Sequence, residues 1–337
     1  MSPATRTIEW RDDAIVIVDQ TVLPGELRLI EIRTVDELVI AIRQLAVRGA
    51  MALGVAGALG VALAARNGDV GRALDDAAGK LVGARPTAVN LAWGVKRALA
   101  ARAGGRAAIL DAALEVLRED VATNRAIARR GAAFLIGRRR VLTHCNAGGL
   151  AAVEVGTALA VIGALHDLEE LDIAYVCETR PLLQGARLTT WELGRMGVPH
   201  QLIVDGAAAG LIVGGNVDAV VVGADRIAAN GDVANKVGTL AHALAARRAG
   251  IPFVVAAPES TIDADTPDGR SIEIEERDPS EVLAFRGVST APRGTRVRNP
   301  AFDVTPADLV TAIVTERRLI LPAEAALNTH NALKLGT

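Results

Sequence analysis

Five short apolar runs rich in Val and Ile follow one another from residue 140 onward, and a polar residue or Gly and then a helical pattern comes after each. The runs cover residues 141–144, 173–177, 201–204, 219–222 and 253–257. Strands that alternate with helices form a parallel sheet covered by helices on both faces. The alternation therefore predicts an α/β chain with a Rossmann-like parallel-sheet domain.

The chain before residue 136 has a different pattern. Residues 8–19 alternate apolar and polar around Asp12-Asp13, which predicts a short β-hairpin. Apolar positions then recur at helical spacing in residues 35–45, 50–65, 91–99 and 109–127. We therefore expect a mainly helical N-terminal domain over residues 1–135 and a Rossmann-like catalytic domain over residues 136–337.

Composition excludes several classes of partner. Half of the 337 residues are apolar and the net charge is −2, with basic and acidic residues interspersed. No field of one sign directs the chain to nucleic acid or to an anionic membrane, so a small molecule is the expected partner. Residues 49–65 are uncharged, but this segment is shorter than the roughly 20 apolar residues of a spanning helix. We interpret it as a buried helix.

The first residues and the cysteines indicate a cytoplasmic location. Residues 1–8 contain no apolar run after a basic segment, as a secretory signal would. Cys145 and Cys177 could pair only once, which is not the disulfide framework of a secreted domain. Both are expected to be free thiols.

Polar residues follow each predicted strand, and the carboxyl ends of parallel strands are where open α/β sheets bind ligands. These residues are Cys145-Asn146, Glu178-Thr179-Arg180, Asp205-Gly206, Asp225-Arg226 and Glu259-Ser260. Each alone could be a helix cap or a turn. Five in succession along one edge favour a binding site.

Cofactor and metal motifs are missing from the sequence. There is no G-x-G-x-x-G after a strand, no G-x-x-x-x-G-K-[ST] and no H-E-x-x-H. The five histidines are dispersed, so we expect no metal-ligand cluster, no metal and no cofactor. His144 adjoins Cys145, but neighbours on a strand point to opposite faces, which argues against a catalytic Cys-His pair.

Four motifs around these strand ends resemble, in the same order, the signatures of the methylthioribose-1-phosphate isomerase superfamily. They are Thr143-His144-Cys145-Asn146-Ala147-Gly148, Glu178-Thr179-Arg180-Pro181 with residues 184–188, residues 223–227, and Asn235-Lys236-Val237-Gly238-Thr239. Shorter matches extend over nearly the whole chain, at residues 8–10, 19–24, 48–50, 85–91, 274–277 and 299–306. One departure is Met51, where the family usually has Pro. Unlike Pro, Met51 has a backbone N–H, and it lies at an expected phosphate-binding turn.

The resemblance implies an aldose-ketose isomerase that converts 5-methylthioribose 1-phosphate to 5-methylthioribulose 1-phosphate in methionine salvage. It assigns catalysis to Asp225, as general acid, and to Cys145, as a polarising or proton-relaying group. We expect apolar walls around Asp225 that raise its pKa. The implied substrate-binding residues are Arg48, Gly49, Ala50, Arg85, Gln184, Asn235 and Lys236.

Several alternatives stay open at the level of sequence. The superfamily also contains isomerases of 5-deoxyribose 1-phosphate and ribose 1,5-bisphosphate, and noncatalytic regulatory subunits of a translation-factor exchange complex. The motifs fix neither the substituent on the ribose 5-position nor the choice between a hydride and an enediolate route. The family forms homodimers, so a homodimer is expected by resemblance.

Overall fold

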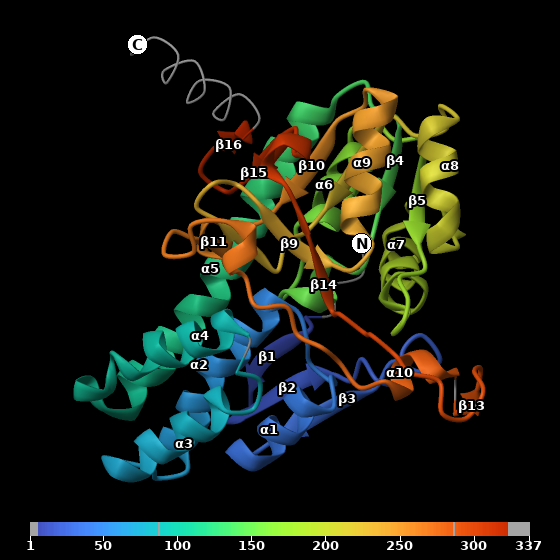
Figure 1. Ribbon diagram of the computed structural model, residues 1–337. Coiled ribbons are helices and arrows are strands. Elements are labelled where there is room, and N and C mark those ends of the chain that lie inside the picture. The colour runs from blue at the N-terminus through green and yellow to red at the C-terminus, as the bar shows by residue number, and fades with distance from the viewer. Residues whose placement is uncertain (1–5, 87, 286, 323–337) are drawn as a thin grey trace, which may run out of the picture. The chain divides into compact units, whose positions relative to one another are not determined.

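The computed structural model describes residues 6–86, 88–285 and 287–322. It combines N-terminal helices and a small antiparallel sheet with a mostly parallel seven-stranded sheet, which confirms the predicted α/β class (Figure 1). The described residues divide into two compact units, one within residues 6–126 and 146–160 and the other within residues 127–145 and 161–322. Each unit is therefore assembled from two separate stretches of chain, whereas the sequence predicted one boundary between residues 135 and 136.

The first unit contains a three-stranded antiparallel sheet and a group of helices. Strands β1 (Ile8–Arg11) and β2 (Ala14–Val18) form the predicted hairpin, and β3 (Leu29–Ile32) adds a third strand that the sequence did not predict. The helices are α1 (Val35–Arg43), α2 (Ala50–Arg66), α3 (Arg72–Val82), α4 (Val89–Leu99) and the first part of α5 (Gly105–Leu135).

Helix α2 is the buried centre of this unit. All of its residues from Ala52 to Ala65 are buried, and α4 packs along it so closely that the two backbones touch. A Cβ on Gly94 would lie 1.8 Å from the carbonyl oxygen of Gly54, and one on Gly57 would lie 2.5 Å from that of Leu91. The glycines of α2 thus allow close helix packing within the unit.

No helix in the described part of the chain has the length and apolar character that a membrane span requires. This agrees with the interpretation of residues 49–65 as a buried helix.

The second unit is built on the seven-stranded sheet. Its strands, in spatial order, are β16 (Leu319–Ile320), β15 (Ala312–Val314), β10 (Phe253–Ala256), β7 (Ala219–Val222), β4 (Arg140–Thr143), β5 (Ile173–Cys177) and β6 (His200–Ile203). All neighbours pair in parallel except the edge strand β16. Counted along the chain, the six parallel strands have the order 3-2-1-4-5-6 of a doubly wound Rossmann fold.

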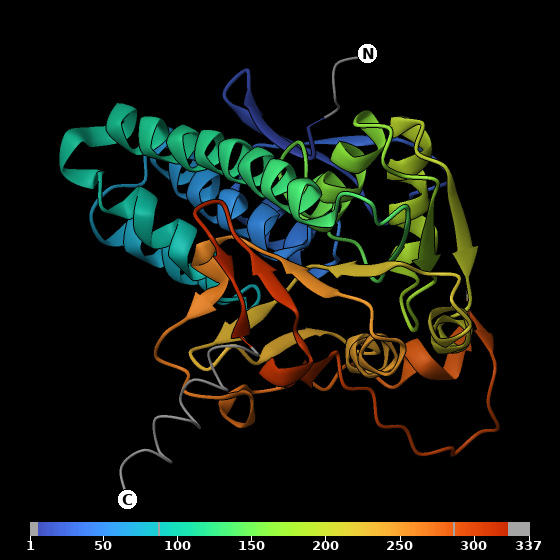
Figure 2. The same cartoon turned by 90° about the horizontal axis from the view of Figure 1, so that it is seen from above.

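Helices cover both faces of this sheet. Helices α8 (Ala208–Val213) and α9 (Thr239–Ala249) lie side by side on one face, and Figure 2 views both end-on. Helices α6 (Ala158–Asp167) and α7 (Thr190–Met196) lie with the end of α5 on the other: Gly131 of α5 faces Val161, and Gly163 of α6 faces Met196. Val, Ile and Ala side chains fill the space between sheet and helices.

A second, four-stranded sheet follows β7 and was not predicted. Its order is β11 (Ile262–Asp263), β8 (Arg226–Ala228), β9 (Val233–Lys236) and β14 (Phe302–Thr305). A turn at Asn230-Gly231 joins β8 to β9, with Gly231 at φ 91°. The remaining short elements are α10 (Ser280–Leu283), β12 (Ala284–Phe285) and β13 (Val288–Ser289).

A buried carboxyl in α5 predicts a pH-dependent stability. Burial raises the pKa of Asp120 from 3.8 to about 7, although the carboxylate accepts a hydrogen bond from the N–H of Val153 (3.0 Å). The folded protein then binds more protons than the unfolded chain between pH 4 and 7, so the free energy of unfolding falls as pH rises through this range. We expect Asp120→Asn to remove this loss, which amounts to a few kcal/mol, on the order of 1.4 per pKa unit.

The measurement is urea unfolding of the wild type and of Asp120→Asn at pH 5 and pH 8. The variant should gain stability relative to the wild type at the higher pH. An equal difference between the two proteins at both pH values would contradict the assignment.

Candidate active site

Cys145 and Asp225 follow the two strands between which the order of the sheet reverses. Strand β4 ends at Thr143 and β7 at Val222, and the two pair in parallel with Val141 opposite Ala219. In doubly wound sheets, ligands bind beyond the carboxyl ends of the strands at this switch point. The structure therefore brings both predicted catalytic residues to the carboxyl ends of neighbouring central strands.

The backbone of Cys145 is held in an unusual conformation. Its φ is 64°, which a residue with a side chain seldom adopts. The N–H of Cys145 donates to Oγ1 of Thr179 (2.8 Å), and the hydroxyl of Thr189 donates to the carbonyl oxygen of Cys145 (2.6 Å). Strained backbone of this kind concentrates at active sites and persists only where neighbouring groups fix it. These two bonds fix the position of the half-buried thiol.

Asp205 supports the same region from the end of β6. Its carboxylate accepts hydrogen bonds from the N–H of Thr179 (2.8 Å) and the N–H of Arg180 (2.7 Å). Thr179, which bonds to Cys145, is itself at φ 65°. Asp205 thus orders the loop after β5, which in turn supports Cys145.

Asp225 is more exposed than the sequence predicted. Its N–H donates to the carbonyl oxygen of Ala234 (2.9 Å), which ties it to β9, but its side chain is exposed. The expected enclosure by apolar walls is therefore wrong. The reason is local: Gly223 and Ala224 carry the chain out of the sheet before Asp225, so the apolar strand β7 does not surround it.

Lys236 and Asn235 lie on β9 as buried polar side chains. The ammonium of Lys236 donates to the carbonyl oxygen of Ala301 (2.7 Å) and lies 4.6 Å from the centre of the Phe302 ring, and the amide of Asn235 donates to Oγ1 of Thr239 (3.0 Å). Strand β14 pairs with β9, and Phe302 at its start and Ala301 just before it contact Lys236, which gives the motif at residues 299–306 a structural role. A buried ammonium of this kind attracts an anion.

Gln184 precedes a π-helical turn, Gly185–Thr189, a feature frequent at functional sites. The side chain is 6 % exposed, and its Oε1 has no hydrogen-bond partner in the described residues. Buried amide oxygens are nearly always bonded, so a water or a ligand is the expected partner. Gly185 is required here because a Cβ would lie 1.8 Å from the carbonyl oxygen of Cys177.

Arg48, Gly49 and Ala50 form the turn that begins α2, in the first unit. The guanidinium of Arg48 donates to Oδ1 of Asn146, the residue that follows Cys145. Gly49 has φ 93°, and a Cβ there would lie 2.5 Å from Cα of Ala151. The N-cap residue Gly49 has no side chain to cap α2, so the first backbone N–H groups, including that of Met51, have no acceptor within the helix, as at an anion site.

Arg85 lies in the same unit, in the turn between α3 and α4. It is half-buried, and its carbonyl oxygen accepts a hydrogen bond from the N–H of Ala88 (3.0 Å). Among the predicted binding residues, the structure thus places Arg48 to Ala50 and Arg85 in the first unit. Gln184, Asn235 and Lys236 belong to the second unit, with Cys145 and Asp225.

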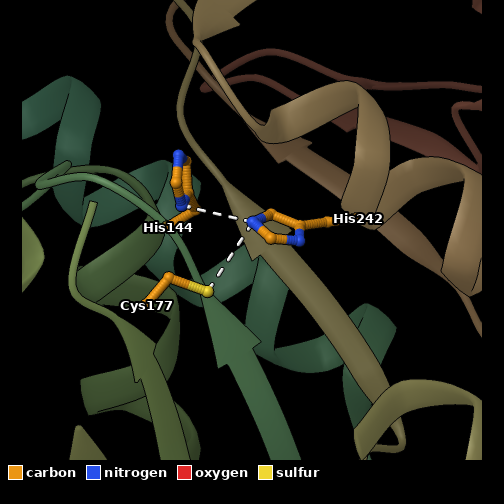
Figure 3. A group of neighbouring side chains, drawn as sticks. All are labelled: His144, Cys177 and His242. Carbon is orange, nitrogen blue, oxygen red and sulfur yellow. Dashed lines mark hydrogen bonds between the residues drawn. The ribbon is translucent and has the colours of Figure 1, made fainter. Parts of the chain in front are cut away.

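Two histidines and a cysteine converge, although the sequence predicted no such cluster. His144 follows β4, Cys177 ends β5, and His242 lies in α9 (Figure 3). The distance from Nδ1 of His144 to Nε2 of His242 is 3.2 Å, and from Sγ of Cys177 to the same nitrogen 3.6 Å. The expectation of dispersed histidines is therefore wrong, because it considered spacing along the chain and the three residues come from different elements.

Burial sets the protonation of this cluster. It lowers the pKa of His144 to about 4 and that of His242 to about 3, and it raises the pKa of the Cys177 thiol. Both imidazoles are therefore neutral at pH 7. Nε2 of His144 donates to the carbonyl oxygen of Val237 (2.9 Å), because a carbonyl can only accept, and this leaves a lone pair on Nδ1.

A comparison with protein families identifies the family of this chain. The model of the Initiation factor 2 subunit family matches residues 46–322. The chain belongs to this family. The membership confirms the resemblance drawn from the strand-end motifs.

Relatives within the family are similar over nearly the full chain. A 5-deoxyribose 1-phosphate isomerase of Moorella thermoacetica is 52% identical, and a methylthioribose-1-phosphate isomerase of Gloeobacter violaceus is 49% identical. The alignments cover 94% and 95% of this chain, and 94% of each relative. A probable bifunctional methylthioribose-1-phosphate isomerase/methylthioribulose-1-phosphate dehydratase of Nocardia farcinica is 52% identical over 95% of this chain, which spans only 60% of that protein.

The fold is also that of a solved family member. The crystal structure of 5-methylthioribose 1-phosphate isomerase from Pyrococcus horikoshii superimposes with a TM-score of 0.89 and 39% sequence identity, covering 97% of this chain and 96% of that one. The Rossmann-like domain predicted from the sequence is therefore an element of the family fold.

Proposed function

We propose that this chain is an aldose-ketose isomerase that converts 5-methylthioribose 1-phosphate to 5-methylthioribulose 1-phosphate. The observation that carries the proposal is the placement of Cys145 and Asp225 at the ends of the neighbouring strands β4 and β7, in a chain about half identical to isomerases of this class. The reaction opens the sugar ring and moves a hydrogen from C2 to C1, so it needs acid-base groups and no net oxidation.

Ring opening is the first step that such an enzyme must catalyse, because the substrate carries a phosphate on the anomeric oxygen. This phosphate blocks spontaneous ring opening, so the protein has to assist that step. We assign phosphate and sugar binding to Arg48, Gly49, Ala50, Arg85, Gln184, Asn235 and Lys236. The buried Lys236 ammonium and the uncapped start of α2 are the features that favour this assignment.

Asp225 is assigned as the general acid and base on the ring oxygen and hydroxyl. Its side chain is exposed in the structure, so a bound sugar phosphate can reach it. A bound phosphate dianion and the exclusion of water by the sugar would both raise the pKa of this carboxyl. The acid function would then be switched on by the substrate.

Cys145 is assigned to the hydrogen transfer between C1 and C2. In an enediolate route the thiolate would remove the proton from C2, and in a hydride route the thiol would polarise the reacting oxygen. The backbone at φ 64° and its two hydrogen bonds favour a role that needs a fixed direction of the side chain. Both routes remain compatible with this geometry.

The substituent on the ribose 5-position is tested by comparing substrates. The purified full chain is assayed with the 5-methylthio, 5-deoxy and 5-phospho forms of ribose 1-phosphate. We expect the highest kcat/KM with the 5-methylthio form. A higher value with 5-deoxyribose 1-phosphate would move the assignment to the activity named for the Moorella thermoacetica relative, and no turnover of any form would favour a noncatalytic regulatory role.

We also infer a cytoplasmic location, as for a metabolic enzyme of this kind, and, on the resemblance alone, a homodimer. Sedimentation of the purified protein at micromolar concentration tests the dimer, and a monomer there would remove the inference.

Arg48→Ala and Arg85→Ala are expected to weaken substrate binding. Each removes a cation from the proposed phosphate site, and a charge-assisted hydrogen bond contributes about 1.5–3 kcal/mol, so the Kd should rise about 10- to 10²-fold. Isothermal titration with substrate and steady-state KM measure the effect. Because Arg48 also bonds to Asn146, thermal unfolding of the variant is recorded to separate lost binding from lost stability.

The matched control is Arg102→Ala. Arg102 pairs with Asp75 (2.7 Å), and both side chains are more than half exposed, so the change should leave the Kd within about twofold. An unchanged Kd in Arg48→Ala or Arg85→Ala would return that arginine to a purely structural role.

A further inference from the structure

We propose that His144, Cys177 and His242 form a binding site for one Zn²⁺-like cation beneath the strand end that carries Cys145. The proposal concerns a second site, because none of these side chains belongs to the residues assigned to the sugar phosphate. It stands on the geometry of three ligand atoms from three elements (Figure 3).

The spacing of the ligand atoms fits tetrahedral zinc. With Zn–N near 2.05 Å and Zn–S near 2.3 Å, two nitrogens lie about 3.3 Å apart and a nitrogen and a sulfur about 3.6 Å apart. The observed separations are 3.2 Å between Nδ1 of His144 and Nε2 of His242, and 3.6 Å from Nε2 of His242 to Sγ of Cys177. All three atoms lie within 4.8 Å of one another. Two of the three separations therefore already match those around one tetrahedral ion.

A hydrogen bond to the backbone already orients one ligand, His144. The hydrogen bond from Nε2 of His144 to the carbonyl oxygen of Val237 (2.9 Å) is the contact that usually fixes a metal-binding histidine, and it directs the lone pair of Nδ1 into the cluster. Oδ1 of Asp205 lies 3.9 Å from this Nδ1. A carboxylate and a thiolate next to a divalent cation balance its charge.

Hydrogen bonds within the described residues do not satisfy both ring nitrogens of His242. If its proton is on Nε2, it satisfies Nδ1 of His144 but leaves the buried Nδ1 of His242 without a donor. If the proton is on Nδ1, two lone pairs face each other at 3.2 Å, and the N–H has no acceptor in the described residues. A cation between the rings would accept both facing lone pairs together with the thiolate.

The donor set selects the class of metal. Two imidazoles and one thiolate suit zinc and similar borderline-soft ions, whereas Mg²⁺ and Ca²⁺ require oxygen ligands. Coordination converts the Cys177 thiol to a thiolate, so each bound M²⁺ forms one M–S bond and releases one proton to solvent. Because each bound ion displaces one proton, the affinity should increase with pH.

The test titrates the metal-free full chain with Co²⁺ as a spectroscopic probe, and with Zn²⁺ in weak buffer to count protons. The metal is added to native protein and during refolding, because His144, Cys177 and His242 are 1 %, 0 % and 3 % exposed. We expect one equivalent of Co²⁺ with a thiolate charge-transfer band, and one proton released per Zn²⁺. Cys177→Ser should lose the band, and His242→Gln should bind at least about 10²-fold more weakly.

Two control variants test whether the sulfur and nitrogen ligands come from this cluster. Cys145→Ser and His200→Gln change a cysteine and a histidine outside the cluster and should keep the band. A band that survives in Cys177→Ser, or no thiolate band in the wild type, would overturn the proposal.

A second measurement on the wild type covers the case in which the variants do not fold. X-ray absorption at the zinc edge of the loaded protein should show one sulfur and two imidazole nitrogens. A shell made only of oxygen and nitrogen would reject the site. None of these readouts uses isomerase activity, so they are independent of the proposed function.

Discussion

Asp225→Asn is expected to lower kcat for 5-methylthioribose 1-phosphate by about 10²- to 10⁴-fold, the usual contribution of a general acid. The amide keeps the shape of the carboxyl and one acceptor oxygen but cannot carry a proton. KM should therefore change much less than kcat, because the interaction removed is one that matters in the transition state. Steady-state and single-turnover kinetics on folded protein measure both quantities.

Asp218→Asn is the matched control for this prediction. Asp218 immediately precedes β7, the strand that Asp225 follows. The same substitution is thus made at the amino-terminal end of the strand, away from the proposed site. Its carboxylate bonds to the guanidinium of Arg140 (2.6 Å), so the control variant should lose some stability. Its kcat per folded molecule should remain within a few-fold of the wild type. Near-normal turnover in Asp225→Asn would end the assignment of Asp225 as the acid.

The parallel sheet could be predicted because its central strands β7 and β10 are buried on both faces. Strands of this kind form continuous apolar runs, and β7, with all four residues buried, is the clearest case. The five predicted strands match β4, β5, β6, β7 and β10 with shifts of at most one residue at each end. The strands β15 and β16 were missed, because two or three residues are too few to show a period, and β3 was missed because Glu31 interrupts its short apolar run.

The candidate site was predictable only in part. The strand-end rule located Cys145 and Asp225, because it depends on the order of strands and not on side-chain packing. The exposure of Asp225 could not be derived, since it depends on how Gly223 and Ala224 leave the sheet. His144 and His242 are 98 residues apart in the sequence, and only the packing of α9 on the sheet brings them together.

Cys145→Ser is expected to lower turnover by about 10²-fold or more. A hydroxyl has nearly the shape of a thiol, but its pKa is far above the roughly 8.5 of a free cysteine, so it is a poor proton carrier. The two backbone hydrogen bonds that hold Cys145 at φ 64° do not involve the sulfur and should survive the change. The variant should therefore keep the position of the side chain and lose only its acidic group. We expect kcat to fall by a larger factor than the affinity for substrate.

The control for Cys145→Ser is Cys177→Ser, the same substitution in a thiol that is fully buried and whose pKa is raised by burial. A thiol of this kind cannot act as a base at neutral pH, so the change should affect stability more than turnover per folded molecule. Alkylation gives an independent test, because substrate should slow the reaction of the half-buried Cys145. If single-turnover rates of the two serine variants prove indistinguishable, Cys145 has no part in proton transfer, and Asp225 is left as the one residue assigned to the chemistry.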